Sequence, residues 1–358
     1  MSKAGKRILV GVVLAFLALA AAGLAYWMVQ QAMPPAAPLP AATPAPGQPG
    51  EAPVVEIPLS GPIAKAQAEI SGLGWYGNSL ILLPQYPERF AGGAEGALFA
   101  LPRQQIEDFL NSKLAGPLEP QPVPFDMAGI ETQVPGFEGF EAIAFDDDRM
   151  YLTIEASPGS AMMGYVVAGT MAPDLSAARL DPATLTPNQP QARRDNTSDE
   201  ALLISGDQIL TFFEANGAAV NPAPHATRFN LELQPGNPLP LAALEYRLTD
   251  TTAPDAQGRF WAINYFFPGD EDLDAANDPL AAGGEGPTHA SSEIVERLVE
   301  FQITPEDVRL SDTAPIWLQL RSDGEARNWE GLAVLPGQGF LLATDKFPAT
   351  ILGFMAYP

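Results

Sequence analysis

The sequence predicts an all-β protein: a five-bladed β-propeller closed by an N-terminal strand. Five segments share one pattern, in which an apolar stretch, a turn with Gly or Asp and a second apolar stretch follow each other as in a β-hairpin. They start at residues 71, 141, 200, 250 and 330, so they are 50 to 80 residues apart, the length of one four-stranded blade with its loops. Continuous helix patterns are nearly absent, and residues 103–114 and 292–299 are the only fair candidates.

The two ends of the predicted propeller complement each other. Another strand-like run follows each hairpin, and the last of these, Ile351–Met355, leaves the final blade with only three strands. Residues Val54–Leu59 form an apolar strand with no blade of its own. We expect this strand to complete the last blade, because closure removes open sheet edges. A two-domain sandwich is the alternative, but the even spread of the repeats favours a propeller over residues 54–358.

The residues before the propeller predict a membrane anchor and a spacer. Residues 1–7 are basic, and residues 8–29 form an uncharged run long enough to cross the ~30 Å hydrocarbon core of a membrane as a helix. No Lys or Arg occurs from residue 8 to residue 64, which predicts a cytoplasmic N-terminus and an extracytoplasmic domain. Cleavage as a signal peptide near residues 20–22 is the alternative. Residues 30–53 are rich in Pro and Ala, which favours an extended linker.

The charge and composition of the chain exclude several classes of function. Its 358 residues include 43 acidic and 19 basic ones, which gives a formal net charge of -24. This charge opposes binding to nucleic acid, so contact with the cytoplasmic membrane is expected only through residues 8–29. The absence of cysteine excludes disulfides, thiolate nucleophiles and cysteine metal sites.

Acidic residues recur at matched positions of the five predicted hairpins. Residues equidistant from a turn are expected to be cross-strand neighbours, and seven of the ten positions so paired are acidic, where composition predicts about one. Like charges directly opposite each other destabilise a sheet, so something should compensate for them. The five pairs are Ser71 with Gln85, Glu141 with Glu155, Glu200 with Glu214, Asp250 with Asn264, and Glu330 with Asp345.

In a propeller the first strand of each blade lines the central channel, so these acids are predicted to converge on one channel mouth. Carboxylate and amide oxygens suit a hard cation, and the large, irregular ligand set favours calcium over magnesium. The expected ligands are the inner ring of Glu141, Glu200, Asp250 and Glu330, with Glu155, Glu214 and Asp345 as further ligands. The alternative is that the acids accept backbone N–H bonds as strand caps and pair with nearby cations, without a metal.

Four basic residues lie close in sequence to the matched positions: Arg89, Arg247, Arg327 and Lys346. They could serve as ion-pair partners of the acids, or they could bind an anionic group of a ligand above the metal. We expect Tyr86, Phe267 and Phe347, which follow the second strands of three hairpins, to rim the mouth. The insertion Gly269–Ser292 is rich in acids and is predicted to be a mobile loop, with a weak second calcium site as the alternative.

Several repeat segments resemble the phytase-like family described as "esterase-like activity of phytase". The likeness covers roughly residues 55–358, is best over residues 329–355, and rests on Trp329–Ala333 and Gly339–Leu352 with Ile70–Leu73 and Phe140–Ala144. It implies a propeller, hydrolysis of a phosphoester or ester, and calcium. Ser71 and Gln85 depart from the acids of the other repeats, and the few cations make a densely phosphorylated substrate such as phytate unsuitable.

Two classes of function follow from these patterns. The first is a metal-dependent hydrolase of a small phosphoester or ester, in which Glu155 acts as the base and the basic residues neutralise developing charge. The second is a non-catalytic, membrane-tethered propeller that binds an envelope protein or a small anionic ligand through its open face. The chain has no Gly-x-Ser-x-Gly elbow, P-loop or HExxH motif.

Overall fold

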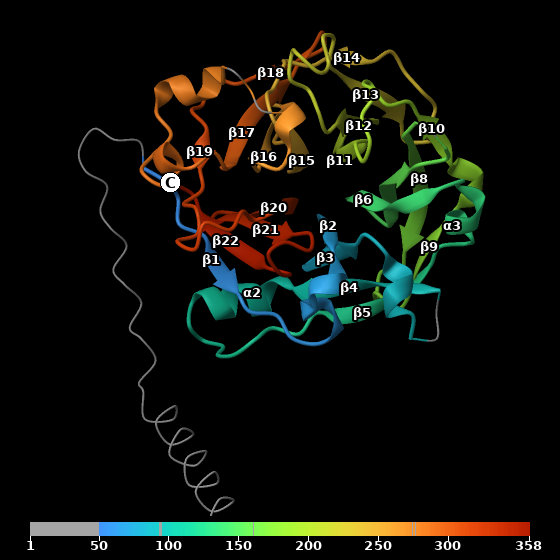
Figure 1. Cartoon of the computed structure of the whole chain (residues 1–358). Helices are drawn as coiled ribbons and strands as arrows, with labels where there is room; N and C mark the ends of the chain where they lie inside the picture. Colours follow the sequence, from blue (N-terminus) through green and yellow to red (C-terminus); the bar gives the residue numbers. More distant parts are fainter. Residues whose placement is uncertain (1–49, 93–94, 160, 274, 276) are drawn as a thin grey trace, which may run out of the picture. The chain divides into compact units, whose positions relative to one another are not determined.

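Antiparallel strands in four sheets make up most of the chain in the computed structural model, which describes residues 50–358 except 93–94, 160, 274 and 276. Each repeat of the sequence forms a hairpin whose first strand lies nearest the centre of the molecule (Figure 1). The strands are rich in apolar and β-branched residues on both faces, as expected for sheets that pack on both sides. The all-β prediction is confirmed.

The largest sheet contains the first two repeats. Its strand order is β2-β3-β4-β5-β9-β8-β7-β6, and the two halves meet where β5 and β9 pair in parallel. The first half comprises β2 (Ile70–Tyr76), β3 (Ser79–Pro84), β4 (Gly96–Pro102) and β5 (Gln121–Asp126). The second comprises β6 (Phe137–Asp146), β7 (Arg149–Ala156), β8 (Met163–Met171), β9 (Ala178–Leu180) and β10 (Thr186–Asn188), which pairs with β8.

The third and fourth repeats form one sheet each. The third sheet is β11 (Asp199–Ser205), β12 (Gln208–Phe213), β13 (His225–Asn230) and β14 (Leu239–Pro240). The fourth is β15 (Arg247–Thr251), β16 (Arg259–Phe266), β17 (Val295–Ile303), β18 (Val308–Leu310) and β19 (Ile316–Trp317). Residues 292–299, a helix candidate in the sequence, lie mostly in β17, because this segment pairs with β16 and β19 and is buried there, Glu296 and Arg297 included.

The last sheet joins the two ends of the folded region. It consists of β20 (Trp329–Leu335), β21 (Gly339–Thr344) and β22 (Leu352–Ala356), completed by β1 (Val55–Ile57). Strand β1 pairs antiparallel with β22, and Glu56 lies opposite Gly353. The predicted closure by the N-terminal strand is confirmed.

The five inner strands form a closed ring: β2 contacts β6, β6 contacts β11, β11 contacts β15, β15 contacts β20, and β20 contacts β2 (Figure 1). Hydrophobic clusters fill the spaces between successive repeats, including the space between the last sheet and the first. A ring of sheets packed face to face around a central axis is the arrangement of a β-propeller.

Helices are few in the described residues. They are α2 (Arg103–Leu110), which confirms the first helix candidate, and the single turn α3 (Ile130–Gln133), together with short 3-10 turns. No helix in the described part of the chain is both long and apolar enough to span a membrane. The predicted anchor, residues 8–29, and all but the end of the predicted linker lie outside the described residues.

Candidate functional site

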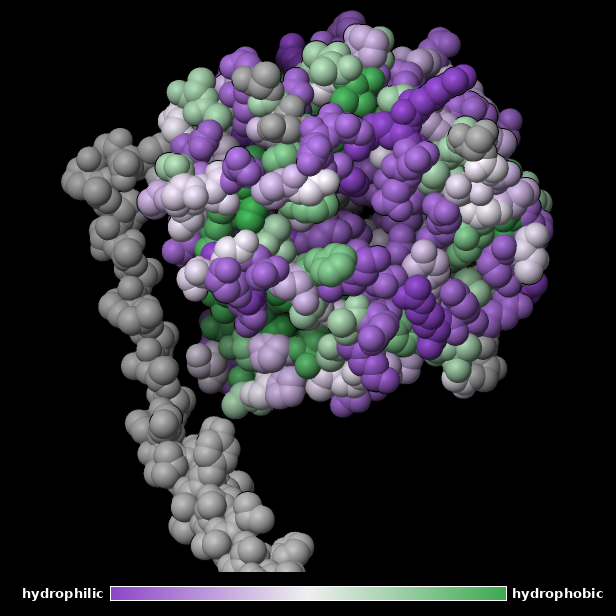
Figure 2. Space-filling model, in the orientation of Figure 1, coloured by the Kyte–Doolittle hydropathy of each residue, from purple (hydrophilic) through white to green (hydrophobic). Residues whose placement is uncertain are grey.

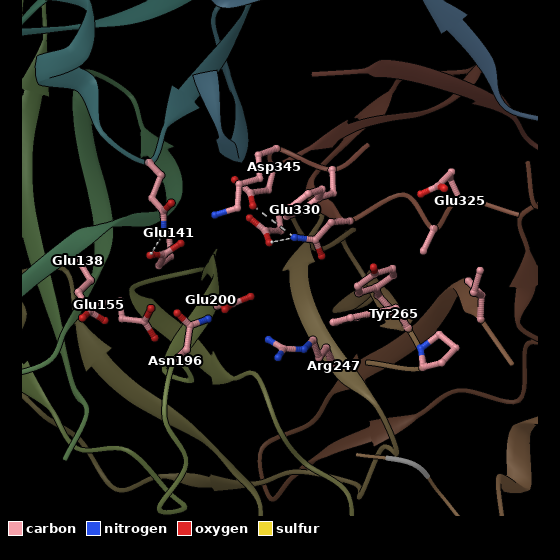
Figure 3. A pocket seen from close by; sticks show the side chains of 18 of the residues that line it. Glu138, Glu141, Glu155, Asn196, Glu200, Arg247, Tyr265, Glu325, Glu330 and Asp345 are labelled. Carbon is pink, nitrogen blue, oxygen red and sulfur yellow. Dashed lines mark hydrogen bonds between the residues drawn. The ribbon is translucent and has the colours of Figure 1, made fainter. Parts of the chain in front are cut away.

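A cavity of about 750 Å³ opens at the end of the ring where the inner strands begin. Hydrophilic side chains gather around this hollow near the centre of the face (Figure 2). Of the residues at the matched positions and the basic residues near them, eight line the cavity: Gln85, Glu141, Glu155, Glu200, Arg247, Glu330, Asp345 and Lys346. These residues come from all four sheets, so the structure brings together most of the predicted site (Figure 3).

The register of the hairpins differs from the predicted one. Glu155 lies opposite Gly139 rather than Glu141, and Asn264 lies opposite Leu248 rather than Asp250. Three of the hairpin turns contain two residues, and the inner strands contain β-bulges, so the direct cross-strand pairing of the matched residues is wrong. The inner-strand members of all five pairs lie within a bulge: Ser71, Glu141, Glu200, Asp250 and Glu330.

The bulges still leave three predicted acid pairs close enough to influence each other's pKa. Burial, followed by the charge of Glu155, holds the pKa of Glu141 well above its usual range. Burial is also the largest cause of the raised pKa of Glu200 and of Glu330. The next largest cause is the charge of Glu214 for Glu200 and the charge of Asp345 for Glu330. Without a cation, these carboxyl groups therefore tend to keep their protons.

Glu155 has the environment of a proton acceptor that works near neutral pH. Its side chain lines the cavity and is 3% exposed. Burial raises its pKa to about 8, with smaller contributions from the charges of Glu214 and Glu138. A carboxyl group with such a pKa can both gain and lose a proton under physiological conditions.

Four acids near the cavity have a buried carboxylate oxygen without a hydrogen-bond partner: Glu155 Oε1, Glu200 Oε2, Glu214 Oε2 and Asp345 Oδ1. Glu155, Glu200 and Asp345 line the cavity directly, and their residues are 3%, 8% and 7% exposed. An unpaired buried oxygen costs free energy, and most such groups in folded proteins have a partner. The three that line the cavity could accept from a ligand with positive charge or hydrogen-bond donors.

Amide side chains orient some of the remaining carboxylates. Gln85 Nε2 donates to Glu141 Oε1 at 3.0 Å, and Asn328 Nδ2 donates to Glu330 Oε1 at 2.6 Å (Figure 3). Asn328 Nδ2 also lies 3.4 Å from Asp345 Oδ2. Gln85 stands where other repeats have an acid, and its amide donates a hydrogen bond to Glu141 of the neighbouring repeat.

Arg247 lines the cavity between two acids. Its guanidinium donates to Glu214 Oε1 and, at 2.5 Å, to Asp270 Oδ2. Glu214 pairs with this arginine and does not line the cavity. The two ion pairs hold the guanidinium on the wall through its Nε and one Nη1 donor.

Asp250 does not line the cavity and is a strand cap. Its Oδ2 accepts the N–H of Leu332 at 2.6 Å, and its Oδ1 accepts the N–H of Thr251 at 2.7 Å. Ser71 has a similar structural role, because its Oγ donates to the carbonyl oxygen of Phe140 at 2.6 Å. The prediction of Asp250 as a metal ligand is therefore corrected, and the strand-cap alternative holds at this position.

Two of the four predicted substrate-binding cations do not line the cavity. Arg327 is buried, donates from Nε to Glu296 Oε2 at 2.8 Å, and lies over the Trp329 ring. Arg89 pairs with Glu69 at 2.6 Å and stacks over the ring of Tyr86, 3.9 Å from its centroid. These two arginines form ion pairs with Glu69 and Glu296, which are not their nearest acids in the sequence. Proximity in sequence therefore predicted the wrong partners.

Lys346 lines the cavity and is exposed. Among the described residues it has no ion-pair partner within 4.0 Å, and its ammonium lies 5.8 Å from the centroid of the Phe347 ring. It is the basic residue best placed to contact a bound anion.

The lining also contains residues that the matched positions did not indicate. Tyr86, Phe267 and Phe347 line the cavity as expected, and Tyr265 lies beneath Phe267, with ring centroids 6.2 Å apart. The unpredicted polar residues are Glu138, Asn196, Glu325 and Asn328. Asn196 and Asn328 precede the bulge acids Glu200 and Glu330 by a few residues. Polar residues just before an inner strand could therefore have predicted these two lining residues.

The acidic insertion is tied to the rest of the sheet rather than being free. Asp270 pairs with Arg247 and Arg194, and Asp278 binds the fully buried Arg297 at 2.5 Å. These two acids are therefore engaged in ion pairs, and the mobility of the insertion stays a prediction. Within the described residues, no group of three or more His, Asp or Glu side chains stands ready to hold a metal ion, here or at the cavity.

The donor set of the cavity nevertheless suits calcium chemically. Carboxylate oxygens and the amide oxygens of Gln85, Asn196 and Asn328 are hard donors, and several acids have an unpaired oxygen. Because the side chains do not converge in the cation-free arrangement, ion binding would require them to move inward. The residues present therefore fit a calcium ion by donor type but not as a preformed cage.

Comparison with family models and with curated proteins finds no match. Among solved structures, the chain is similar to an α-L-arabinanase of Cellvibrio cellulosa (11% identity, 80% of this chain and 90% of that chain, TM-score 0.44). It is also similar to a GH43_1 enzyme from Xanthomonas citri (10% identity, 83% and 91%, TM-score 0.44). A structure from the GH130 family of mannoside phosphorylases matches at 9% identity over 82% and 85%, with a TM-score of 0.46. Likenesses of this degree carry no conclusion about activity.

Proposed function

We propose that the chain is a membrane-anchored, extracytoplasmic, five-bladed phytase-like propeller with a calcium-dependent site that hydrolyses a small phosphoester or ester. The observation that carries the proposal is the set of unpaired, buried carboxylate oxygens at Glu155, Glu200 and Asp345 around one open cavity. The closed ring of inner strands supports the five-bladed count. The anchor rests on residues 8–29 of the sequence alone.

The proposed calcium ligands are drawn from the acids that line the cavity: Glu141, Glu155, Glu200, Glu330 and Asp345. Glu214 does not line the cavity and is not proposed as a direct ligand; its carboxylate binds Arg247 instead. Asp250 is excluded, because its carboxylate is occupied by backbone N–H groups. A bound calcium ion would polarise the ester oxygen and neutralise several carboxylates.

The protein side chains supply the remaining chemistry. The pKa of Glu155 is about 8 without a cation, and a neighbouring calcium ion would lower it, so that the carboxylate could accept the proton of an attacking water at neutral pH. Lys346 can approach a negatively charged ester group, whereas Arg247 is held by its two acids and mainly shapes the wall. With so few cations at the cavity, a substrate with one phosphate or acyl group fits better than a densely phosphorylated one.

Chromogenic esters test this proposal. p-Nitrophenyl phosphate and p-nitrophenyl acetate are offered to the purified domain in calcium and in EDTA. We expect turnover of at least one ester in calcium, a loss of about a hundredfold or more in Glu155→Gln, and little change in Asp207→Asn, an exposed turn residue at the other end of the β11–β12 hairpin. Equal rates for wild type and Glu155→Gln would contradict the role of Glu155.

A non-catalytic binding function is the second candidate. It is favoured by the lining, which contains no Ser, Thr, His or other activated nucleophile among the described residues. In this case the cavity would hold an envelope protein segment or a small ligand without turning it over. Binding of calcium without hydrolysis of either ester would favour this candidate over the first.

A further inference from the structure

The cavity is larger and more acidic than one calcium ion requires. Its volume of about 750 Å³ lies within the range of about 300–1,000 Å³ that is typical of sites for small organic molecules. Seven carboxyl groups line it, against the two cations Arg247 and Lys346. Because Asp270 and Glu214 already pair with Arg247, a single divalent ion leaves several of the carboxyl groups without a positive partner.

Aromatic rings accompany the acids at the entrance. Phe347 is 59% exposed and Phe267 is 39% exposed, although both are large apolar side chains on the cavity wall. The protein's own cations already lie over such rings, since Arg89 stacks on Tyr86 and Lys346 lies over Phe347. Aromatic faces attract ammonium groups, and alkyl chains can cover their apolar surface.

The acids are spread across the cavity rather than gathered at one point. Glu138 and Glu155 lie on one side, Glu330 and Asp345 in the middle, and Glu325 on the far side (Figure 3). This spread explains why the described acids do not form a compact metal cluster. It matches a ligand whose positive charges are themselves separated by an apolar spacer.

We propose that the cavity binds a linear organic amine with two or more ammonium groups joined by methylene chains, a di- or polyamine. The ammonium groups contact the separated carboxylates, including the unpaired oxygens of Glu155 and Asp345, and the methylene groups lie against Phe267 and Phe347. The inference rests on the proposed function only in using the same cavity; it needs neither calcium nor hydrolysis. A neutral diol would leave the carboxyl groups without a positive partner, and in the absence of calcium an anion would be repelled.

Isothermal titration calorimetry with spermidine tests the proposal, with 1,4-butanediol as the uncharged probe. The titrations are done in EDTA and at near-physiological salt. The net charge of -24 attracts any polycation non-specifically, and salt screens this attraction. We expect saturable, one-to-one binding of spermidine and none of the diol. Phe267→Leu and Phe347→Leu should each weaken binding about two- to fivefold, the effect of a cation–π contact at an exposed site.

Charge variants separate specific binding from general attraction. Glu138→Gln and Glu325→Gln, which are not proposed calcium ligands, should weaken spermidine binding and leave the calcium-induced rise in melting temperature unchanged. Asp207→Asn removes the same charge outside the cavity and should bind spermidine like wild type.

The amine proposal is overturned if wild type shows no saturable binding, or if the Phe and Glu138 variants bind spermidine as wild type does. If calcium still raises the melting temperature in that case, the proposed calcium site stands alone. Spermidine binding without any effect of calcium on the melting temperature would support the amine site and contradict the calcium site.

Discussion

The carboxylate of Asp250 joins two inner strands: its Oδ2 accepts the N–H of Leu332, on β20, at 2.6 Å. A second hydrogen bond joins the same two strands, because the Thr249 hydroxyl donates to the carbonyl oxygen of Trp329 at 2.6 Å. Asp250 lies in an inner-strand bulge, as the cavity acids do, but has a structural role, because its carboxylate accepts the N–H groups of Leu332 and Thr251. Equivalent positions in the repeats therefore do not have equivalent functions.

Replacing Asp250 should affect stability rather than ion binding. We expect Asp250→Ala to lower the free energy of unfolding by about 1–3 kcal/mol, the cost of leaving a buried N–H group without an acceptor. The variant should retain the rise in melting temperature on addition of calcium. Calorimetry with and without calcium measures both quantities, and loss of the calcium effect in a folded variant would return Asp250 to the ligand set.

Calcium should stabilise the domain through the cavity acids. A bound ion contributes about 2.7 kcal/mol at a hundredfold excess over Kd, which corresponds to a rise of several degrees in melting temperature. Glu200→Gln and Glu330→Gln should lose this rise, whereas Asp207→Asn should keep it. If EDTA leaves the melting temperature of wild type unchanged, the acids are not a calcium site and the metal-dependent hydrolysis is also excluded.

The stability of the calcium-free domain should fall as the pH rises. The pKa of Glu155 is about 8 in the folded protein, so above about pH 4.5 the folded state keeps a proton that the unfolded state has released. Each such proton contributes a loss of about 1.4 kcal/mol per pH unit until the pH passes the folded pKa.

Urea unfolding in EDTA between about pH 5 and about pH 8 measures this slope. Glu155→Gln should flatten it relative to wild type, and Asp207→Asn should run parallel to wild type. Identical slopes for wild type and Glu155→Gln would show that Glu155 titrates normally. Calcium should reduce the loss at the upper end of the range, because it binds the deprotonated carboxylates.

The closing strand β1 should contribute strongly to stability. Ile57 is 2% exposed and packs in the cluster between the last sheet and the first, whereas Val55, on the same strand, is 50% exposed. We expect Ile57→Ala to cost about 2–5 kcal/mol of unfolding free energy and Val55→Ala to change it by less than about 0.5 kcal/mol. Deleting residues 54–60 should cost more than Ile57→Ala. Urea unfolding measures all three, and a neutral deletion would contradict the closure.

The N-terminal segment should remain attached and hold the domain outside the cytoplasmic membrane. Its uncharged 22-residue run is flanked by positive charge only on the N-terminal side. Protease added to intact spheroplasts should remove the domain and leave a small membrane-bound fragment. A mature N-terminus near Gly23 would instead establish cleavage and release.

Local patterns in the sequence were sufficient to predict the repeat hairpins and the closure. Apolar strands around short turns are encoded by neighbouring residues, and the unmatched strand Val54–Leu59 could pair only where an edge was open. The recurrence of acids at the start of the inner strands likewise predicted most of the cavity, because such residues meet at one end of a ring.

The role of each acid was decided only by the tertiary structure. A bulge shifts the register by one residue, and whether the shifted carboxylate meets a backbone N–H, as at Asp250, or an open cavity, as at Glu200, depends on the neighbouring strand. Arg327 and Arg89 likewise form ion pairs with Glu296 and Glu69, which are not among the matched positions. Sequence separation constrains contacts within a hairpin, whereas contacts between hairpins depend on how the sheets pack around the ring.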